Sequence, residues 1–380
     1  MVNAAYIHIP FCEHICYYCD FNKVFIHNQP VEEYLNNLEK EIQLTIASSS
    51  KSSILKSIFV GGGTPTALNE HQLEKLCHII QRQLRYNYQT EFTFEANPGD
   101  LSIDKLEILK EIGVNRISLG VQTFNDLLLE KIGRVHRAKD VFKSIDLATK
   151  VGFKNISIDL IYRLPGQTIN DFNETLETAL SLNVQHYSGY SLIVEPKTVF
   201  YNLMRKGALP LPEEETDAMM YELLIEKMDK HGFKQYEISN FSLPSYESKH
   251  NLTYWNNEEY YGFGAGAHSY LNGYRRSNVG PLTKYFGSIQ KNVLPVFEEN
   301  HVSKREKMEE EMFLGLRKTE GVSIRQFTKK YGLNPLQLFF GEIQTNQEKG
   351  LLTIKEDWIR LTKKGRFLGN EVFQSFIGVI

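Results

Sequence analysis

Short β-rich runs alternate with amphipathic stretches through the first two-thirds of the chain. Six candidate strands lie at Ala5–Ile9, Ser57–Val60, Glu91–Glu95, Arg116–Gly120, Asn155–Ile161 and Tyr187–Leu192. Between them, five candidate helices lie at Val31–Ala47, Glu70–Arg85, Ile103–Ile112, Ala138–Val151 and Ile169–Leu182. Strands that alternate with helices predict parallel βαβ units. The expected fold class is therefore α/β, with a partial (β/α)6 barrel of the TIM type.

The rest of the chain is expected to complete this barrel and to add two further parts. A helix at Glu213–Lys230 and one more strand at Phe233–Phe241 complete a barrel domain over residues 1–241. Residues 242–302 are rich in Gly, Asn, Ser and Tyr, which predicts loops covering one end of the barrel. Residues 303–380 show helical runs followed by two short strand-like runs, a pattern that resembles a winged-helix module.

Charge and hydropathy restrict the partners of the chain. The formal net charge is −3, which gives no electrostatic reason to expect nucleic acid, so a structural role is favoured for the C-terminal module. No apolar stretch approaches the length needed to cross a bilayer, and the N-terminus lacks a basic and apolar leader. We therefore expect a cytoplasmic protein whose contact with membranes is at most peripheral.

Three of the four cysteines, Cys12, Cys16 and Cys19, stand together directly after the first predicted strand. In the reducing cytosol such a group indicates metal ligation or catalysis before a disulfide. Three thiolates can hold three irons of a four-iron cluster and leave the fourth iron open to another ligand. The fourth cysteine, Cys77, lies on the apolar face of a predicted helix, where we expect it to pack in the core.

Unusual residues stand where the predicted strands end, which is where a βα barrel has its working site. They are the turn Gly61-Gly62-Gly63-Thr64, the carboxylates Glu95 and Asp159, and Gln122. Each alone has an ordinary explanation, namely a tight turn, a solvated loop or a polar group satisfied by backbone. Their joint placement on one rim favours a ligand site, because glycines let a charged group approach backbone N–H donors and a buried carboxylate needs a partner.

The Cys-x3-Cys-x2-Cys loop, with Tyr18 before its last cysteine, resembles the signature of the radical S-adenosylmethionine (SAM) superfamily. Nearly the whole chain is similar to the coproporphyrinogen dehydrogenase-like branch of that superfamily. The motifs that carry the resemblance include Tyr6-Ile7-His8-Ile9-Pro10-Phe11-Cys12, Gly61-Gly62-Gly63-Thr64-Pro65, Glu95-Ala96-Asn97-Pro98 and Ser118-Leu119-Gly120-Val121-Gln122.

This resemblance implies two cofactors and the residues that hold them. A [4Fe-4S] cluster would be bound by Cys12, Cys16 and Cys19, and its open iron would be chelated by the amino and carboxylate groups of SAM. The residues implied for SAM are Tyr6, Tyr18, Gly62, Gly63, Thr64, Glu95, Gln122, Arg134, Asp159 and Ile193. The cofactor would carry the chemistry, and the protein would orient it.

Three features resemble the HemW-type heme chaperones more than the dehydrogenases of the branch. Phe21 stands where the dehydrogenases carry a further cysteine, and only five residues precede Tyr6, where the dehydrogenases have a long extension. The run His250-Asn251-Leu252-Thr253-Tyr254-Trp255 matches a His-Asn-x-x-Tyr-Trp motif associated with heme binding. The resemblance implies His250 as a ligand to heme iron. The residue types alone favour a structural interpretation, in which His250 caps a loop and Trp255 fills the barrel mouth.

The favoured interpretation is a heme chaperone that binds a [4Fe-4S] cluster, SAM and heme and delivers heme to apo-hemoproteins, which we expect to be respiratory. Under this interpretation we also expect a homodimer. Arg275 and Arg276 either pair with the propionates of heme or are solvated. The alternative is an oxygen-independent coproporphyrinogen III dehydrogenase, suggested by the same SAM rim. A third hypothesis is a barrel stabilised by zinc, with the three cysteines and His8 or His14 as ligands.

Overall fold

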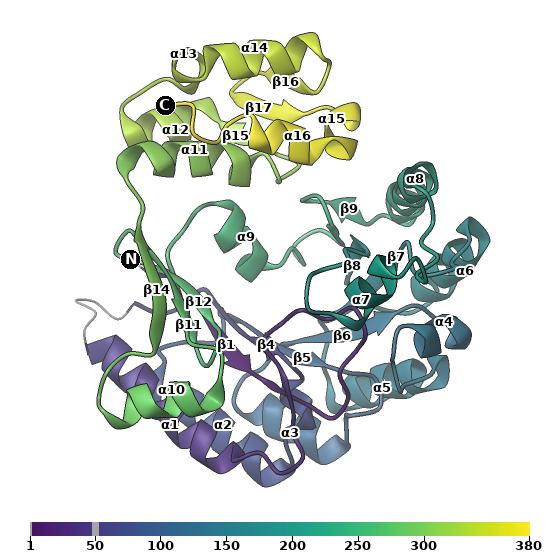
Figure 1. The fold of residues 1–380 in the computed structure, drawn as a ribbon, viewed down its shortest axis with the longest axis vertical. Coiled ribbons are helices and arrows are strands. Elements are labelled where there is room, and N and C mark those ends of the chain that lie inside the picture. Colours follow the sequence, from purple (N-terminus) through teal and green to yellow (C-terminus); the bar gives the residue numbers. More distant parts are fainter. Residues whose placement is uncertain (1, 48–52) are drawn as a thin grey trace.

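The computed structural model describes residues 2–47 and 53–380, and a curved twelve-stranded sheet forms its centre (Figure 1). The six strands from β1 through β4, β5, β6 and β7 to β8 are adjacent and parallel. Their bounds are β1 (Ala4–Ile9), β4 (Ser57–Gly62), β5 (Glu91–Ala96), β6 (Arg116–Gln122), β7 (Ile156–Tyr162) and β8 (His186–Ser191). These are the six strands expected from the sequence, so the predicted α/β class with a partial (β/α)6 barrel is confirmed.

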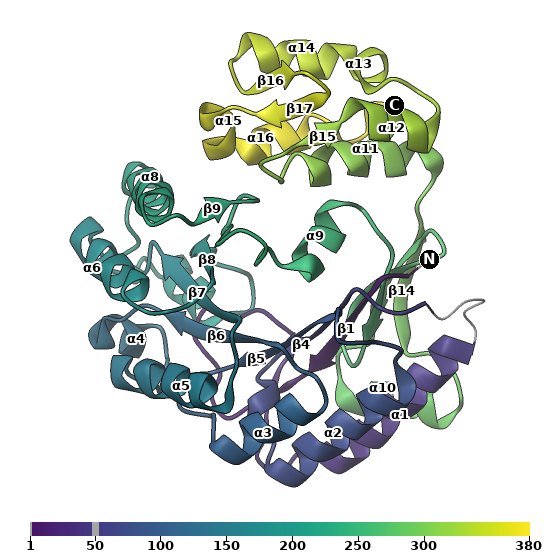
Figure 2. The ribbon, with the colours of Figure 1, turned by 180° about the vertical axis from the view of Figure 1, so that it is seen from behind.

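Helices cover the convex face of the sheet (Figure 2). They are α1 (Val31–Ala47), α2 (Glu70–Gln83), α3 (Ile103–Glu111), α4 (Asp126–Lys131), α5 (Ala138–Val151), α6 (Ile169–Leu180) and α8 (Glu214–Lys230). The period of two along each strand explains the layering. In β7, Ile158 and Leu160 belong to the main apolar core, whereas Asp159 between them faces the concave side. No helix within the described residues combines the length and the apolar character needed to cross a membrane.

Local sequence signals account for the start and the buried face of α2. Asn69 and Gln72 form a capping box, in which each side chain accepts a hydrogen bond from the backbone N–H of the other residue. Leu73, Leu76 and Cys77 then follow at helical spacing and are buried. The fourth cysteine therefore packs in the core, as expected.

Short elements fill the connections at the carboxyl ends of the parallel strands. They are β2 (Phe11–Cys12), β3 (Val24–Phe25), the 3-10 helix η1 (Pro65–Ala67) and α7 (Val199–Arg205). The strands β2 and β3 pair with each other within the loop that carries the cysteines. This end of the sheet therefore holds the least regular part of the barrel, as expected for the end that carries a site.

The single strand predicted at Phe233–Phe241 is wrong. The chain instead forms a hairpin of β9 (Lys234–Gln235) and β10 (Asn240–Ser242), and β10 pairs antiparallel with β8. The carboxylate of Glu237 accepts hydrogen bonds from the backbone N–H of Ser239, at 3.0 Å, and from the side chain of Asn240. These contacts close a turn in the middle of the apolar run, which the periodicity of the sequence does not reveal.

Residues 242–302 are more regular than the covering loops that we expected. They contain α9 (Lys249–Trp255), β11 (Tyr260–Phe263), β12 (His268–Leu271), β13 (Tyr274–Asn278), α10 (Leu282–Gln290) and β14 (Val296–His301). Strand β11 pairs parallel with β1, and the other three strands continue the sheet in antiparallel order. The Asn and Gly residues that suggested loops occupy tight turns instead, as at Asn272 and Gly273, which have φ of 52° and 78° and join β12 to β13.

The C-terminal residues form a module with its own apolar core. Its elements are α11 (Lys304–Gly315), β15 (Val322–Ser323), α12 (Ile324–Tyr331), α13 (Pro335–Leu338), α14 (Phe340–Glu348), β16 (Leu352–Lys355), β17 (Trp358–Leu361), α15 (Lys363–Phe367) and α16 (Gly369–Gln374). Helices followed by the β16–β17 hairpin agree with a winged-helix-like unit. The chain end packs against it, because the Glu309 carboxylate accepts hydrogen bonds from the backbone N–H groups of Gly378, Val379 and Ile380 at 2.9, 2.7 and 2.9 Å.

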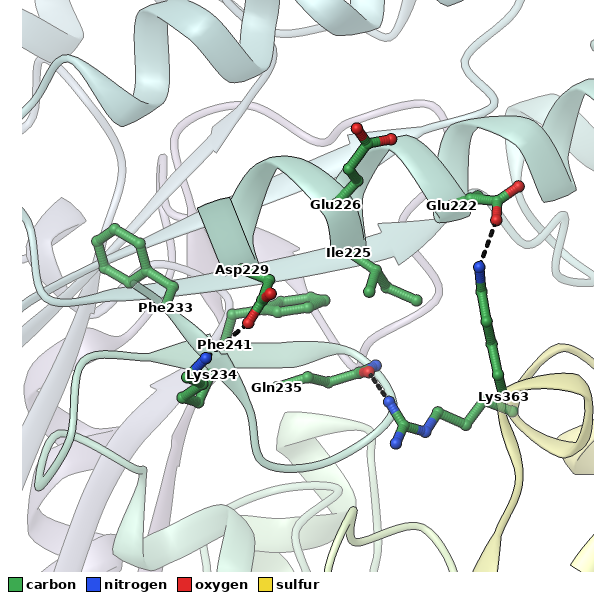
Figure 3. Close-up of a pocket in the computed structure, with 10 residues that line it drawn as sticks. Glu222, Ile225, Glu226, Asp229, Phe233, Lys234, Gln235, Phe241 and Lys363 are labelled. Carbon is green, nitrogen blue, oxygen red and sulfur yellow. Dashed lines mark hydrogen bonds and ion pairs between the residues drawn. The ribbon is translucent and has the colours of Figure 1, made fainter. Parts of the chain in front are cut away.

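Several polar contacts join this module to the barrel, and two of them border one hollow (Figure 3). Lys363 Nζ lies 2.6 Å from Glu222 Oε1 on α8, and Arg366 Nη1 donates to Gln235 Oε1 on β9 at 2.8 Å. They border a hollow of about 480 Å³ between the two parts. The hollow contains none of the residues predicted for cofactor binding, so it serves the contact between the parts and does not enlarge the candidate site.

Replacing Gly262 of β11 by alanine is expected to lower the urea midpoint of unfolding. An ideal Cβ at this position would lie 1.8 Å from the carbonyl oxygen of His268, so the backbone must shift, at a cost of about 1–3 kcal/mol. Gly287→Ala is the matched control, because Gly287 lies within α10 with nothing within 4 Å of an added Cβ. That change should stabilise the protein by about 0.5–1 kcal/mol. Equal midpoints for the two variants would contradict this packing.

Candidate functional site

The loop that carries the cysteines is held against the glycine turn after β4. The backbone N–H of Gly63 donates to the carbonyl of Ile9 at 2.8 Å, and that of Thr64 donates to the carbonyl of Phe11 at 2.8 Å. Farther along, Tyr17 N–H donates to the carbonyl of Ile132 at 3.1 Å. These bonds fix both ends of the loop, and its three cysteines line one cavity of about 420 Å³.

Two of the thiols, Cys12 and Cys19, lie where burial disfavours their ionisation. Cys12 is buried and accepts a hydrogen bond from Thr64 Oγ1 at 3.7 Å, while Cys16 and Cys19 are half-buried. Burial raises the pKa of Cys12 to about 11 and also raises the pKa of Cys19. Bound metal reverses this effect, because thiolate is the ligating form.

The arrangement of these ligands suits a cluster of several irons. In the described ranges, no three His, Cys, Asp or Glu side chains converge on a point that one metal ion could occupy. A four-iron cluster presents a separate iron atom to each thiolate, so its ligands need not converge in this way. Of the two histidines considered for zinc, His14 lines the cavity, whereas both ring nitrogens of His8 have hydrogen-bond partners in Tyr6 and Asn22. The donor set therefore fits a cluster better than a single zinc ion.

Most residues implied for SAM meet in the cavity of the cysteines. Those that line it are Tyr18, Gly62, Gly63, Thr64, Glu95, Gln122, Arg134, Asp159 and Ile193. They come from the cysteine loop, from the carboxyl ends of β4, β5, β6 and β7, from residue 134 beyond α4, and from the loop after β8. Two predicted residues, Tyr6 and His250, are absent from this cavity wall. The strand-end pattern of the sequence thus predicts which side chains the fold brings together.

Two buried carboxyl groups and one guanidinium give the cavity its electrostatic character. Glu95 Oε2 accepts the backbone N–H of Gly62 at 3.0 Å, yet burial raises the pKa of Glu95 to about 7. Burial also raises the pKa of Asp159, against hydrogen bonds that favour its ionised form. Arg134 Nη2 donates to Tyr18 Oη at 2.9 Å and its Nη1 donates to Asn97 Oδ1 at 2.6 Å. Carboxyls beside a fixed cation suit a ligand that carries both charges, as SAM does.

The backbone at the end of β6 has an uncommon conformation. Gln122 has φ of 70°, and the pairing of β6 with β7 shifts register between Gly120 and Gln122. A Cβ on Gly120 would lie 3.0 Å from Gln122 Nε2 and 3.1 Å from Arg134 Nη2. Such conformations persist where the surroundings enforce them, often at functional sites. The bulge turns Gln122 into the cavity, and the glycine leaves room for both side chains.

Several cavity residues were not predicted. Asn97 is the most informative, because its side chain accepts from Arg134 and donates to Thr64 Oγ1 at 2.9 Å, which links the rim of β5 to the turn after β4. Its place directly after Glu95-Ala96 at a strand end was the signal that could have found it. Other unpredicted lining residues are Lys23, Tyr190, Ser191 and Glu195. Tyr190 follows the period of two along β8, so its inward direction could also have been predicted.

A second cavity of about 690 Å³ adjoins the first one. The two cavities share Asp20, Phe21, Gly62 and Glu95 as lining residues. The second cavity is bounded by β1, β11, β12, α9 and Leu314 of α11, so the C-terminal module closes one side. Its further lining residues include Tyr6, His8, Tyr254, Trp255, Tyr260, His268 and Arg275. Tyr6, predicted to contact SAM, thus lies in the adjoining cavity.

The structure does not place His250 on the wall of either cavity. Its ring is buried beneath Tyr254, with Nδ1 3.0 Å from Ser57 Oγ and Nε2 2.8 Å from Tyr254 Oη. Burial lowers the pKa of His250 to about 3, which keeps the ring neutral. The two arginines considered for propionates already have acidic partners, since Arg275 pairs with Glu310 and Arg276 pairs with Glu299.

Comparisons with known proteins agree with this geometry. The model described as the radical SAM superfamily matches residues 6–179, and that of the HemN C-terminal domain matches residues 302–368. The chain is 57% identical to the heme chaperone HemW of Bacillus subtilis (strain 168), over 99% of this chain and 100% of the relative. It is 47% identical to the heme chaperone HemW of Lactococcus lactis subsp. lactis (strain IL1403), over 99% of this chain and 97% of the relative.

Among solved structures, the coproporphyrinogen III oxidase HemN from Escherichia coli, a radical SAM enzyme, is similar in fold. The TM-score is 0.87 at 24% sequence identity, and the match covers 100% of this chain and 91% of that one. At this identity the likeness shows the fold alone.

Serine substitution of Cys12, Cys16 or Cys19 is expected to abolish iron and sulfide binding after anaerobic reconstitution, because each thiolate would hold one iron. Iron and acid-labile sulfide analyses, with the visible absorbance of the cluster, measure the outcome. Cys77→Ala is the matched control and should keep a full cluster, since Cys77 is buried in α2 outside the cavity. Loss of the cluster only in the Cys77 variant would overturn the assignment.

The affinity for SAM is expected to rise between pH 6 and pH 8. The pKa of Glu95, held at about 7 by burial, means that its carboxyl is mostly neutral at pH 6 and mostly charged at pH 8. A carboxylate attracts the cationic groups of SAM, so ionisation strengthens binding. Equilibrium dialysis with the reconstituted protein measures the affinity at each pH. Glu95→Gln should flatten the rise, and an unchanged pH profile in that variant would count against the role of Glu95.

Proposed function

The chain belongs to the radical SAM superfamily and, within it, to the family of HemW-type heme chaperones, and from this we propose that it binds heme beside a [4Fe-4S] cluster and delivers it to apo-hemoproteins. Relatives named heme chaperone HemW align with it from end to end at 57% and 47% identity. Full-length similarity at this level includes the C-terminal module as well as the barrel.

Superfamily membership implies a [4Fe-4S] cluster and SAM. We assign the cluster to Cys12, Cys16 and Cys19, with the open iron facing SAM in the same cavity. Glu95 and Asp159 would face the cationic groups of SAM, while the glycine turn after β4 admits a ligand close to the backbone. When bound, the cluster supplies electrons to SAM. The residues of this chain orient the ligand and exclude water from its polar groups.

The second cavity is the observation that carries the heme proposal. Its volume of about 690 Å³ lies within the roughly 300–1,000 Å³ common for ligand sites. Aromatic rings form part of its wall, since Tyr6, Phe21, Tyr254, Trp255 and Tyr260 are among the lining residues. Flat aromatic faces suit a porphyrin, which is itself a large planar ring system. Because the two cavities share a wall, heme would lie directly beside the cluster and SAM.

Partners and location follow as parts of the same proposal. The recipients would be apo-hemoproteins, respiratory ones first, and a second copy of the chain would assemble with it as a homodimer. The protein would act in the cytoplasm and reach membrane-bound recipients by peripheral contact. The net charge of −3 offers no attraction to nucleic acid.

The competing function is oxygen-independent coproporphyrinogen III dehydrogenation. The likeness in fold to E. coli HemN and the SAM residues shared by one cavity are the observations that favour it. Phe21 counts against it, because this exposed side chain stands between the two cavities where the dehydrogenases have a further cysteine. Chaperone function therefore agrees better with this chain.

Heme titration of the anaerobically reconstituted protein tests the proposal. We expect saturable binding with a shifted Soret band, transfer of heme to an apo-hemoprotein such as apomyoglobin, and no turnover of coproporphyrinogen III with SAM. Leu314→Trp, which fills the second cavity, should weaken heme binding by about tenfold or more, the equivalent of about 1.4 kcal/mol. Leu127→Trp on the exposed face of α4 is the matched control and should bind like the wild type.

Two results would contradict the chaperone proposal. One is the absence of saturable heme binding by the wild-type protein. The other is formation of protoporphyrinogen with release of 5′-deoxyadenosine, which would establish the dehydrogenase instead.

A further inference from the structure

Three histidines stand at or behind the wall of the second cavity, and they differ in whether a ring nitrogen is free. Binding to heme iron requires an imidazole nitrogen with an available lone pair. Which of these histidines could bind heme iron is a question about the proposed heme site itself. The answer therefore rests on the proposed function.

In both His8 and His250, each ring nitrogen already has a hydrogen-bond partner. His8 Nδ1 lies 2.9 Å from Tyr6 Oη, and its Nε2 lies 2.7 Å from the carbonyl oxygen of Asn22. His250 is bonded through both nitrogens to Ser57 and Tyr254, and its ring is buried behind the cavity wall. Iron ligation by either ring would break a hydrogen bond and leave a buried polar group without a partner, which costs about 1–3 kcal/mol.

His268 is different from both. It lines the second cavity, it is exposed, and its ring makes no hydrogen bond with any described residue. It is the first residue of β12, and it pairs with Ser277 of the neighbouring strand. The imidazole is therefore free to bind a ligand without losing a contact.

The backbone that carries His268 is firmly held. Asn22 Nδ2 donates to the carbonyl of Ala265 at 2.8 Å and to that of Gly280 at 3.1 Å. Gly266, with φ of 78°, packs so closely that an added Cβ would lie 2.7 Å from Asn22 Cβ. The backbone at His268 is therefore preorganised, so little backbone order is lost when its side chain binds a ligand.

His250 has a different part in this arrangement. It lies one helical turn before Tyr254 on α9, and its Nε2 holds the Tyr254 hydroxyl at 2.8 Å. Tyr254 in turn packs edge-on against Tyr260, with ring centroids 4.7 Å apart, and both rings line the cavity. The indole nitrogen of Trp255, the next residue along, is buried without a partner among the described residues. The motif thus supplies cavity walls and an open hydrogen-bond donor.

We propose that His268 is the protein ligand to the heme iron in the second cavity, and that His250 is a positioning residue that holds Tyr254 in the wall. The iron would lie near β12, on the side of the cavity formed by the glycine-rich turn 264–267. The porphyrin would then lie against Tyr254, Trp255 and Tyr260.

Spectroscopic titration with ferric heme, on the full-length protein with its cluster reconstituted, tests this assignment. His268→Ala should lose the Soret and EPR signature of histidine ligation and bind heme at least about tenfold more weakly, since loss of even an outer partner of a metal ligand costs roughly 10- to 100-fold. Added imidazole should restore the signature. His268→Met should replace it by that of thioether ligation, and His250→Ala should keep histidine ligation with weaker binding.

His301→Ala is the matched control, because His301 is exposed on β14 outside both cavities and should leave the spectrum unchanged. Cluster content and the unfolding midpoint confirm that each variant is folded. If the wild type binds heme and His268→Ala keeps its spectrum, the inference fails while the chaperone function stands. The inference also fails if His250→Ala alone loses histidine ligation. If the wild type binds no heme, the proposed function itself fails.

Discussion

Two backbone hydrogen bonds, from Gly63 to Ile9 and from Thr64 to Phe11, join the cysteine loop to the turn after β4, and the rest of the site depends on them. An added Cβ at Gly63 would lie 2.7 Å from the carbonyl oxygen of Phe11, so only glycine allows the two segments to approach this closely. The contact brings the thiols to the strand end that carries Glu95. Without it, the cysteines would belong to a loose surface loop, and the carboxyl groups at the rim would face water.

In the parallel sheet, the alternation of polar and apolar residues along each strand places polar side chains on the concave face. Every second side chain of a strand points to the concave face, so Glu95, Ser118 and Asp159 meet on neighbouring strands, while apolar residues between them pack under the helices. Taking carboxyl groups out of water raises the pKa of Glu95 and of Asp159. Arg134 lies in the same cavity and offsets part of the free-energy cost of burying these carboxyl groups, because its positive charge balances theirs when they ionise.

The parallel strands and the residues at their ends could be predicted because both depend on local patterns. The hairpin at residues 234–242 could not, since it depends on the side-chain contacts of Glu237 within an otherwise strand-like run. The burial of His250 beneath Tyr254 was equally hidden, because the sequence gives the helical spacing of the two residues but not which of them lies beneath the other. His268 ends a glycine-rich run over residues 262–268, and nothing in that run marks the histidine as a ligand. Its position follows from β12 joining the sheet, which the glycine-rich composition of the segment obscured.

The cysteine loop also forms part of the frame of the second cavity. Asn22, three residues beyond Cys19, contacts His8 through its carbonyl oxygen and the turn before β12 through its side chain. Phe21, directly before it, lines both cavities. Any displacement of this short segment therefore changes the walls of both cavities together. The two cavities therefore share part of one frame, which is made by the few residues that follow Cys19.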